Sequence, residues 1–192
     1  MLPHTTLLRL IGILLAGPLV LSAAGTRANA ADGATDRAAL AACLALVKKN
    51  EAARGPHDPD ELTEKPGPEG RLAAARAEAP RRADSCIGVV ATACIQHEGN
   101  QSTATMNQCY GREADAWDAR LNAAYKAALA NGDGQDVADG LRKTQRNWIA
   151  FRDAACAQPA IVFKGTMAGP MSAACVMDLT ARQTLWLEGW VQ

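Results

Sequence analysis

The sequence has few aromatic residues and few histidines: four tryptophans, two tyrosines, two phenylalanines and three histidines among 192 residues. Val, Ile and Phe are scarce while alanine is abundant, and this composition favours closely packed helices over sheets. There is no excess of charge either, because 20 basic residues balance 20 acidic ones. The lack of net positive charge argues against nucleic acid or an anionic lipid surface as a partner.

Long apolar runs are absent after the first thirty residues. In that segment Arg9 precedes an apolar run from Leu10 to Leu21. At about twelve residues the run is too short to cross a bilayer core as a helix. An Ala-Asn-Ala cleavage pattern ends at residue 30. We therefore expect residues 1–30 to be a signal peptide and the mature chain to start at Ala31.

An uncleaved anchor is the alternative, and Pro18 disfavours it by interrupting the apolar run. Cleavage would remove Arg9 and Arg27 but no acidic residue, which leaves 18 basic against 20 acidic residues and a formal charge of −2. No cysteine stands at the cleavage point, so an acyl anchor is not expected. The expected location is the periplasm or the cell exterior, with no membrane insertion after cleavage.

The expected fold is all-α, a disulfide-stapled bundle of four to five helices with a disordered Pro-rich insert. Apolar residues recur at helical spacing in the first helix, as Leu40, Cys43, Leu44 and Val47 show. Residues 31–49 should form this N-terminal helix, 50–82 a flexible linker rich in proline and charge, and 83–192 a helical domain. The individual helices are expected at 35–49, 84–96, 105–130, 136–157 and 171–190.

The six cysteines are Cys43, Cys86, Cys94, Cys109, Cys156 and Cys175. None forms a Cys-x-x-Cys pair, which makes zinc and thioredoxin-like chemistry weak interpretations. An even number in an oxidising compartment indicates three disulfides, for which fifteen pairings exist. Neighbouring helices favour Cys156 with Cys175 and Cys94 with Cys109. Cys43 with Cys86 would then tie the first helix to the bundle.

Four polar side chains fall on or beside apolar helical stripes: Glu113, Gln145, Arg152 and Arg182. A buried charge needs a partner, because an unpaired one costs several kcal/mol. We therefore predict that Glu113 pairs with Arg152 or Arg182 inside the bundle. The network either fixes helix register or faces a ligand.

Catalysis has little support in the sequence. His97 is the one plausible general base, and neither an orienting partner nor an oxyanion site is evident beside it. Acidic pairs such as Glu113 with Asp118, or Asp115 with Asp118, could suggest glycoside chemistry, but solvation of a helix surface explains them too. We expect no enzyme activity, no cofactor and no metal.

Two strings carry a family resemblance: Trp-Asp-Ala-Arg-Leu-Asn-Ala-Ala-Tyr at 117–125 and Gln-Arg-Asn-Trp-Ile-Ala-Phe-Arg-Asp-Ala-Ala-Cys at 145–156. They resemble the paired hallmarks of the LprI-like lysozyme-inhibitor domain family of exported bacterial proteins. Cys175, followed by Thr180 and Arg182, is similar to the closing pattern of that family. Cys86-Ile87-Gly88 with Cys94 resembles its six-cysteine branch. The Pro-rich insert departs from the compact family pattern.

The resemblance implies a disulfide-stapled, exported helical domain that inhibits lysozyme. A protruding loop with a cation could occupy a cleft that holds two carboxylates. The candidate binding loop is 158–173, with Lys164, Thr166 and Ser172, and His97 marks a second loop. The partner would be lysozyme or another envelope protein, since a structural or adaptor role in the envelope is the alternative. The oligomeric state stays open.

Overall fold

The computed structural model describes residues 24–54, 82–97 and 101–190. The expected all-α fold is confirmed, because the described residues form helices and contain no strand. The elements are α1 (Ala24–Arg54), the 3-10 helix η2 (Ala83–Cys86), α3 (Val89–His97), α4 (Thr103–Asn131), α5 (Gln135–Val162) and α6 (Ala168–Trp190). Residues 1–23 of the expected signal peptide and 55–81 of the expected linker lie outside the described residues.

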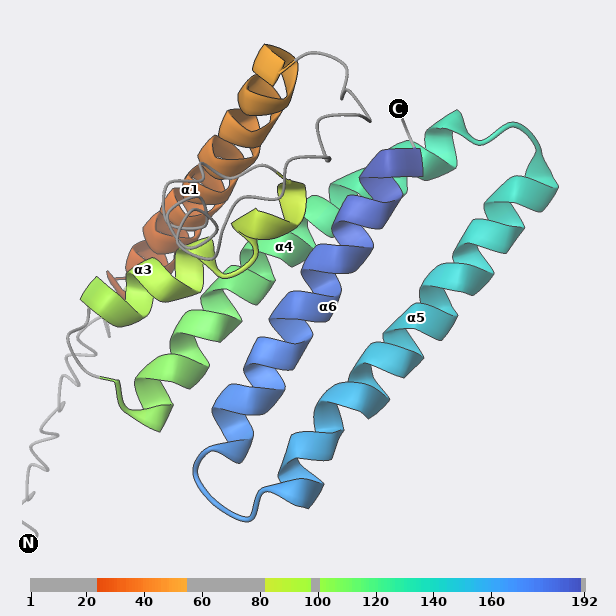
Figure 1. Ribbon diagram of the computed structural model, residues 1–192. Helices are drawn as coiled ribbons and strands as arrows, with labels where there is room; N and C mark the ends of the chain where they lie inside the picture. Colours follow the sequence, from red (N-terminus) through yellow and green to blue (C-terminus); the bar gives the residue numbers. More distant parts are fainter. Residues whose placement is uncertain (1–23, 55–81, 98–100, 191–192) are drawn as a thin grey trace, which may run out of the picture.

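The long helices α4 and α6 form the centre of the bundle and pack against each other along much of their length. Helix α5 packs chiefly on α6, whereas α1 and α3 pack on α4, and η2 contacts α1 and α6 (Figure 1). Helix α6 therefore lies between α4 and α5. As a consequence, α5 has a long-helix neighbour on one side only.

Two apolar clusters hold these helices together. The first joins α1, η2, α3, α4 and α6 around the fully buried Trp117. The second joins α4, α5 and α6 around Leu121, Leu141 and Leu187. The apolar stripe expected on the first helix faces the first cluster, because Leu40, Leu44 and Val47 are all buried there. The 3.6-residue period of the sequence thus specifies which face of each helix packs inward.

Several helix boundaries differ from the sequence expectation. Helix α1 is longer at both ends, in line with its many alanines, which are the best helix formers. The helix expected at 84–96 is divided by Gly88, whose φ of 95° suits a residue without a side chain. Helix α5 continues past Pro159 to Val162, and its last turn is closed by a hydrogen bond of 2.8 Å from Phe163 N to the Pro159 carbonyl.

Local signals begin and end α4. The Ser102 hydroxyl accepts a hydrogen bond of 3.2 Å from Thr105 N, as expected for a Ser/Thr cap. At the other end, a Cβ atom on Gly132 would lie 3.1 Å from the Val137 side chain, so the turn into α5 leaves little room for any other residue. Gly134 in the same turn has a φ of 97°. These glycines set the direction in which α5 leaves α4.

The structure has the three disulfides that reasoning from neighbouring helices favours. Cys43–Cys86 joins α1 to η2 across a separation of 43 residues. Cys94–Cys109 joins α3 to α4, and Cys156–Cys175 joins α5 to α6. The disulfides therefore link three successive pairs of helical segments, α1 with η2, α3 with α4, and α5 with α6.

Candidate functional site

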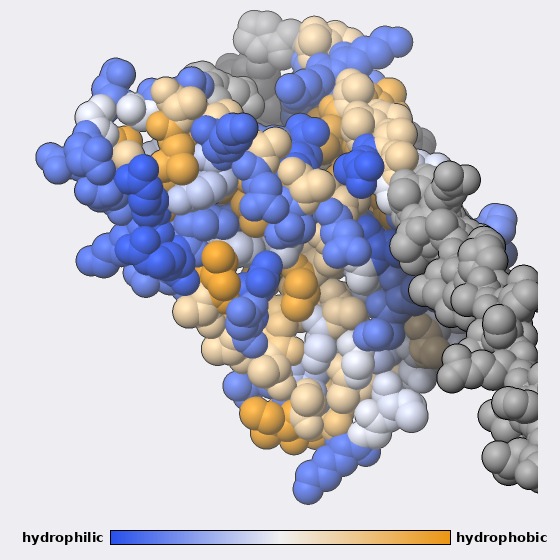
Figure 2. Space-filling model, turned by 180° about the vertical axis from the view of Figure 1, so that it is seen from behind, coloured by the Kyte–Doolittle hydropathy of each residue, from blue (hydrophilic) through white to orange (hydrophobic). Residues whose placement is uncertain are grey.

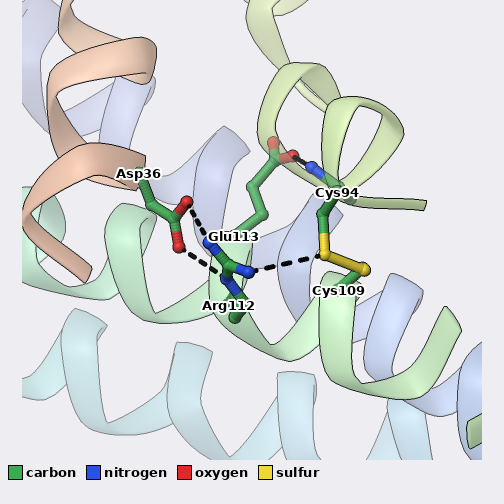
Figure 3. A network of polar contacts seen from close by, with 6 residues as sticks. Asp36, Cys94, Cys109, Arg112 and Glu113 are labelled. Carbon is green, nitrogen blue, oxygen red and sulfur yellow. Dashed lines mark hydrogen bonds and ion pairs between the residues drawn. A yellow bond between two sulfur atoms is a disulfide. The ribbon is translucent and has the colours of Figure 1, made fainter. Parts of the chain in front are cut away.

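The Glu113 side chain is fully buried, with 0% of its surface exposed, and it points at the start of α3 (Figure 3). Its Oε1 accepts hydrogen bonds from Gly88 N at 2.6 Å and Trp117 Nε1 at 3.0 Å. Its Oε2 accepts one from Ala91 N at 2.7 Å. The first N–H groups of a helix lack partners within the helix and carry partial positive charge. Glu113 is therefore a capping group for α3 that is supplied by α4.

The predicted pairing of Glu113 with Arg152 or Arg182 is wrong. Arg152 bonds to its neighbour Asp153 at 2.9 Å, and Arg182 bonds to Asp178 at 2.8 Å. The long stem of Arg182 carries its guanidinium toward water, whereas the Arg152 side chain is 20% exposed and its guanidinium lies over the Trp148 ring. Backbone N–H groups take the place of the expected cation.

Asp36 and Arg112 form a second polar contact, which was not predicted from the polar residues on the apolar stripes. Arg112 donates from Nε and Nη2 to the two carboxylate oxygens of Asp36, at 2.9 and 2.8 Å. The third nitrogen, Nη1, lies 3.8 Å from Cys94 Sγ, so one guanidinium connects α1, α4 and α3 (Figure 3). Asp36 stands four residues before Leu40 on the buried face of α1, and that spacing is the signal that could have revealed it.

Gln145 is buried as expected, and it pairs with a residue that the sequence analysis did not name. Gln183 Nε2 on α6 donates to Gln145 Oε1 on α5 at 3.1 Å. Both residues are 9% exposed. The four expected network residues are therefore not one network: Glu113 caps α3, Gln145 joins α5 to α6, and the two arginines bond to surface carboxylates.

The candidate binding loop is shorter than the sequence suggests, because helices enter it from both sides. Residues 163–167 connect α5 to α6. Lys164 and Thr166 lie on this connection and are exposed, while Ser172 is half-buried in α6. His97 is the exposed last residue of α3, so it belongs to a different element.

Exposed apolar side chains surround the connection. Val162 is 66% exposed, and Ile161, Phe163, Met167 and Met171 are also exposed. Figure 2 shows apolar side chains gathered at the lower end of the molecule, the end at which Figure 1 places this connection. The bond Cys156–Cys175 anchors the two helices near it. At this end of the molecule, the exposed Lys164 therefore lies among exposed apolar side chains, between two helices that a disulfide joins.

Two of the acidic residues of α4, Glu113 and Asp118, are engaged in hydrogen bonds of their own. Both oxygens of Glu113 are engaged, and Asp118 accepts a hydrogen bond of 2.8 Å from Asn122. Burial, followed by repulsion from Asp118, raises the pKa of Asp115. Across 24–54, 82–97 and 101–190, no group of three or more His, Cys, Asp or Glu could hold a metal ion.

The fold and its polar contacts define a disulfide-braced helical domain whose buried polar side chains hold helices together. The family model described as "Lysozyme inhibitor LprI" matches residues 94–187. This part of the chain, from the end of α3 through most of α6, belongs to the LprI family. Helix α1 and the Cys43–Cys86 bond lie outside the match. The chain matches no curated protein and no solved structure.

Proposed function

We propose that the protein is an exported lysozyme inhibitor and that the α5–α6 connection blocks the muramidase cleft. The LprI match supports a lysozyme as the partner, because the family is described as a lysozyme inhibitor. The matched residues 94–187 include this connection. The observation that carries the proposal is the exposed Lys164, which stands between the exposed apolar residues Phe163 and Met167.

Lysozyme clefts hold two carboxylates that face the scissile bond. The Lys164 ammonium can pair with one of them, while Phe163 and Met167 cover the surrounding apolar surface. The bond Cys156–Cys175 restrains the helices on both sides of the connection. A connection that is already ordered loses less conformational entropy on binding, and this favours tight inhibition.

Export is the second part of the proposal. Removal of residues 1–30 would shorten α1, because this helix begins at Ala24. The mature chain would then consist of α1 from residue 31 to Arg54, a linker and the helical domain 83–192. Among the described helices, none has the length and apolar character needed to cross a membrane. The mass of the protein recovered from periplasm or medium should correspond to a chain that starts at Ala31.

A turbidity assay of muramidase activity tests the function. The purified mature protein should inhibit, and Lys164→Ala should raise the inhibition constant by at least about tenfold, as expected for a central interface residue. Lys143→Ala is the matched control, because Lys143 is also exposed but lies in the first half of α5. His97→Ala should have little effect on the inhibition constant, because His97 lies on α3 and not on the α5–α6 connection.

Two outcomes would contradict different parts of the proposal. If the wild-type protein at large molar excess inhibits neither animal nor bacterial muramidases, the inhibitor function is wrong. An envelope adaptor would then account for the exposed apolar surfaces. If the wild-type protein inhibits and Lys164→Ala inhibits equally well, only the assignment of the connection is wrong.

A further inference from the structure

A shallow groove runs between α5 and α6, away from the candidate inhibitory connection. Its volume is about 480 Å³. The lining residues are all uncharged: Thr144, Asn147, Trp148 and Phe151 from α5, with Gln183 and Trp186 from α6. Phe151 and Lys164 are 13 positions apart, so the groove and the connection are separate places on the molecule. None of the groove residues has a role in the proposed inhibition.

The walls of the groove are aromatic and open to solvent. Phe151 is 60% exposed and Trp186 is 41% exposed. Trp190 follows one helical turn later and packs on Trp186, with the ring centroids 5.3 Å apart. Large aromatic side chains are usually covered in a folded domain, because each can bury 150–250 Å² of surface. This groove therefore presents flat apolar faces that the fold itself does not cover.

The groove also contains amide groups, and one of them is held in a fixed position. The hydrogen bond from Gln183 to Gln145 orients the Gln183 carboxamide. Within the described part of the chain it is the one side-chain hydrogen bond of Gln183, which leaves the Gln183 carbonyl oxygen able to accept another. Asn147 and Thr144 add exposed polar groups on the α5 side.

The Trp148 ring is positioned by a cation. The Arg152 guanidinium lies over this ring, 5.0 Å from its centroid, and Asp153 bonds to Arg152 at 2.9 Å. One face of the indole is thus covered by Arg152, so the ring is held while other parts of it line the groove. Arg152 itself is not a lining residue.

We propose that this groove binds a neutral glycan chain. A sugar ring has an apolar face of C–H groups, which packs on an aromatic side chain, and polar substituents at its edge, which bond to amides and hydroxyls. Phe151 and Trp186 supply the first kind of contact, and Gln183, Asn147 and Thr144 supply the second.

The lining also disfavours other ligands. A charged ligand finds no opposite charge among the six lining residues, and a purely apolar one would leave the Gln183 carbonyl oxygen without a donor. The volume falls within the range of ordinary small-ligand sites, about 300–1,000 Å³. A short stretch of an uncharged oligosaccharide satisfies the size, the charge and the mixed lining together.

A titration of the mature protein with chitotetraose, a soluble tetramer of β-1,4-linked N-acetylglucosamine, tests the proposal. Binding should change tryptophan fluorescence in a saturable way, because three of the four tryptophans lie in or beside the groove. Phe151→Ala and Trp186→Ala should each weaken binding by about tenfold or more. Phe163→Ala is the matched control, since Phe163 is an exposed aromatic residue outside the groove, and it should bind as the wild type does.

The fold of each variant is checked by its thermal midpoint, and Phe151→Ala should retain the fold because Phe151 is mostly exposed. No saturable binding up to about 10 mM, or equal weakening by Phe163→Ala, would overturn the proposal. Sedimentation at several concentrations gives a further answer. A dimer that Phe151→Ala abolishes, together with an absence of glycan binding, would assign the groove to a second copy of the chain instead.

Discussion

Glu113 Oε2 accepts a hydrogen bond of 2.7 Å from Ala91 N, although the two residues are 22 positions apart. A side chain of α4 thereby satisfies a backbone donor in the first turn of α3. The carboxylate also lies at the positive end of that helix, where a negative charge is most favourable. The contact ties the position of the short helix α3 to that of the central helix.

Glu113→Gln should therefore destabilise the fold. A carboxamide has one acceptor oxygen, so at least one N–H of α3 would face an NH₂ group. Hydrogen bonds to charged groups contribute about 1.5–3 kcal/mol, and we expect a loss of unfolding free energy of that size in urea denaturation. Asp118→Asn, an exposed change on the same helix, should cost less than about 0.5 kcal/mol. Equal losses in the two variants would contradict the capping role.

The pair of Asp36 and Arg112 should show energetic coupling in a double-mutant cycle. Asp36 is almost fully buried and is contacted by two nitrogens of Arg112, which is partly exposed. We expect a coupling energy of about 1–2 kcal/mol for Asp36→Asn with Arg112→Gln. The exposed pair Asp139 and Arg142 is the control, and its coupling should be about 0.5 kcal/mol or less. Similar coupling energies in both pairs would mean that the Asp36–Arg112 contact holds α1 against α4 no more strongly than an exposed ion pair would.

Removal of the bond between Cys156 and Cys175 should loosen the end that carries Lys164. The bond closes a sequence separation of 19 residues, and the variant with serine at both positions should lose about 3 kcal/mol of unfolding free energy. In limited proteolysis, trypsin should cleave after Lys164 faster than in the wild type, while cleavage after Lys126 within α4 changes less. Unchanged cleavage at Lys164 would mean that the bond does not brace the connection.

Asp115→Asn should stabilise the protein slightly at neutral pH. The Asp115 side chain is largely exposed, but partial desolvation of its carboxyl, followed by the charge of Asp118, raises its pKa above 3.8 in the folded protein. The folded chain thus holds this proton more tightly than the unfolded chain, so ionisation disfavours folding. The penalty is absent below pH 3.8 and grows as the pH rises through the raised pKa. The thermal midpoint of the variant should exceed that of the wild type at pH 7 and match it near pH 3, and a constant difference at both would contradict this cause.

The helices and their buried faces could be predicted from the sequence, because apolar spacing reports directly on packing. Leu40, Leu44 and Val47 show this on α1. The burial of Glu113 could be predicted in the same way, but its partner could not. The sequence suggests partners of opposite charge, which are side chains. The backbone N–H groups at the start of α3 can be recognised as partners only when the position of the turn at Gly88 is known. Similarly, residue spacing could not show that Arg152 reaches Asp153 rather than the core.

Helix α5 is joined to its neighbours near both ends but packs chiefly along one side. The glycine turn after α4 holds its start, and the bond from Cys156 to Cys175 holds it near its end. If α5 separates from α6, these tethers keep the two surfaces at a high effective concentration, so return is intramolecular and fast. A ligand that contacts both helices would stabilise their packed arrangement and slow this opening. Amide hydrogen exchange along α5 would then report how much of the groove is occupied, whatever the identity of the ligand.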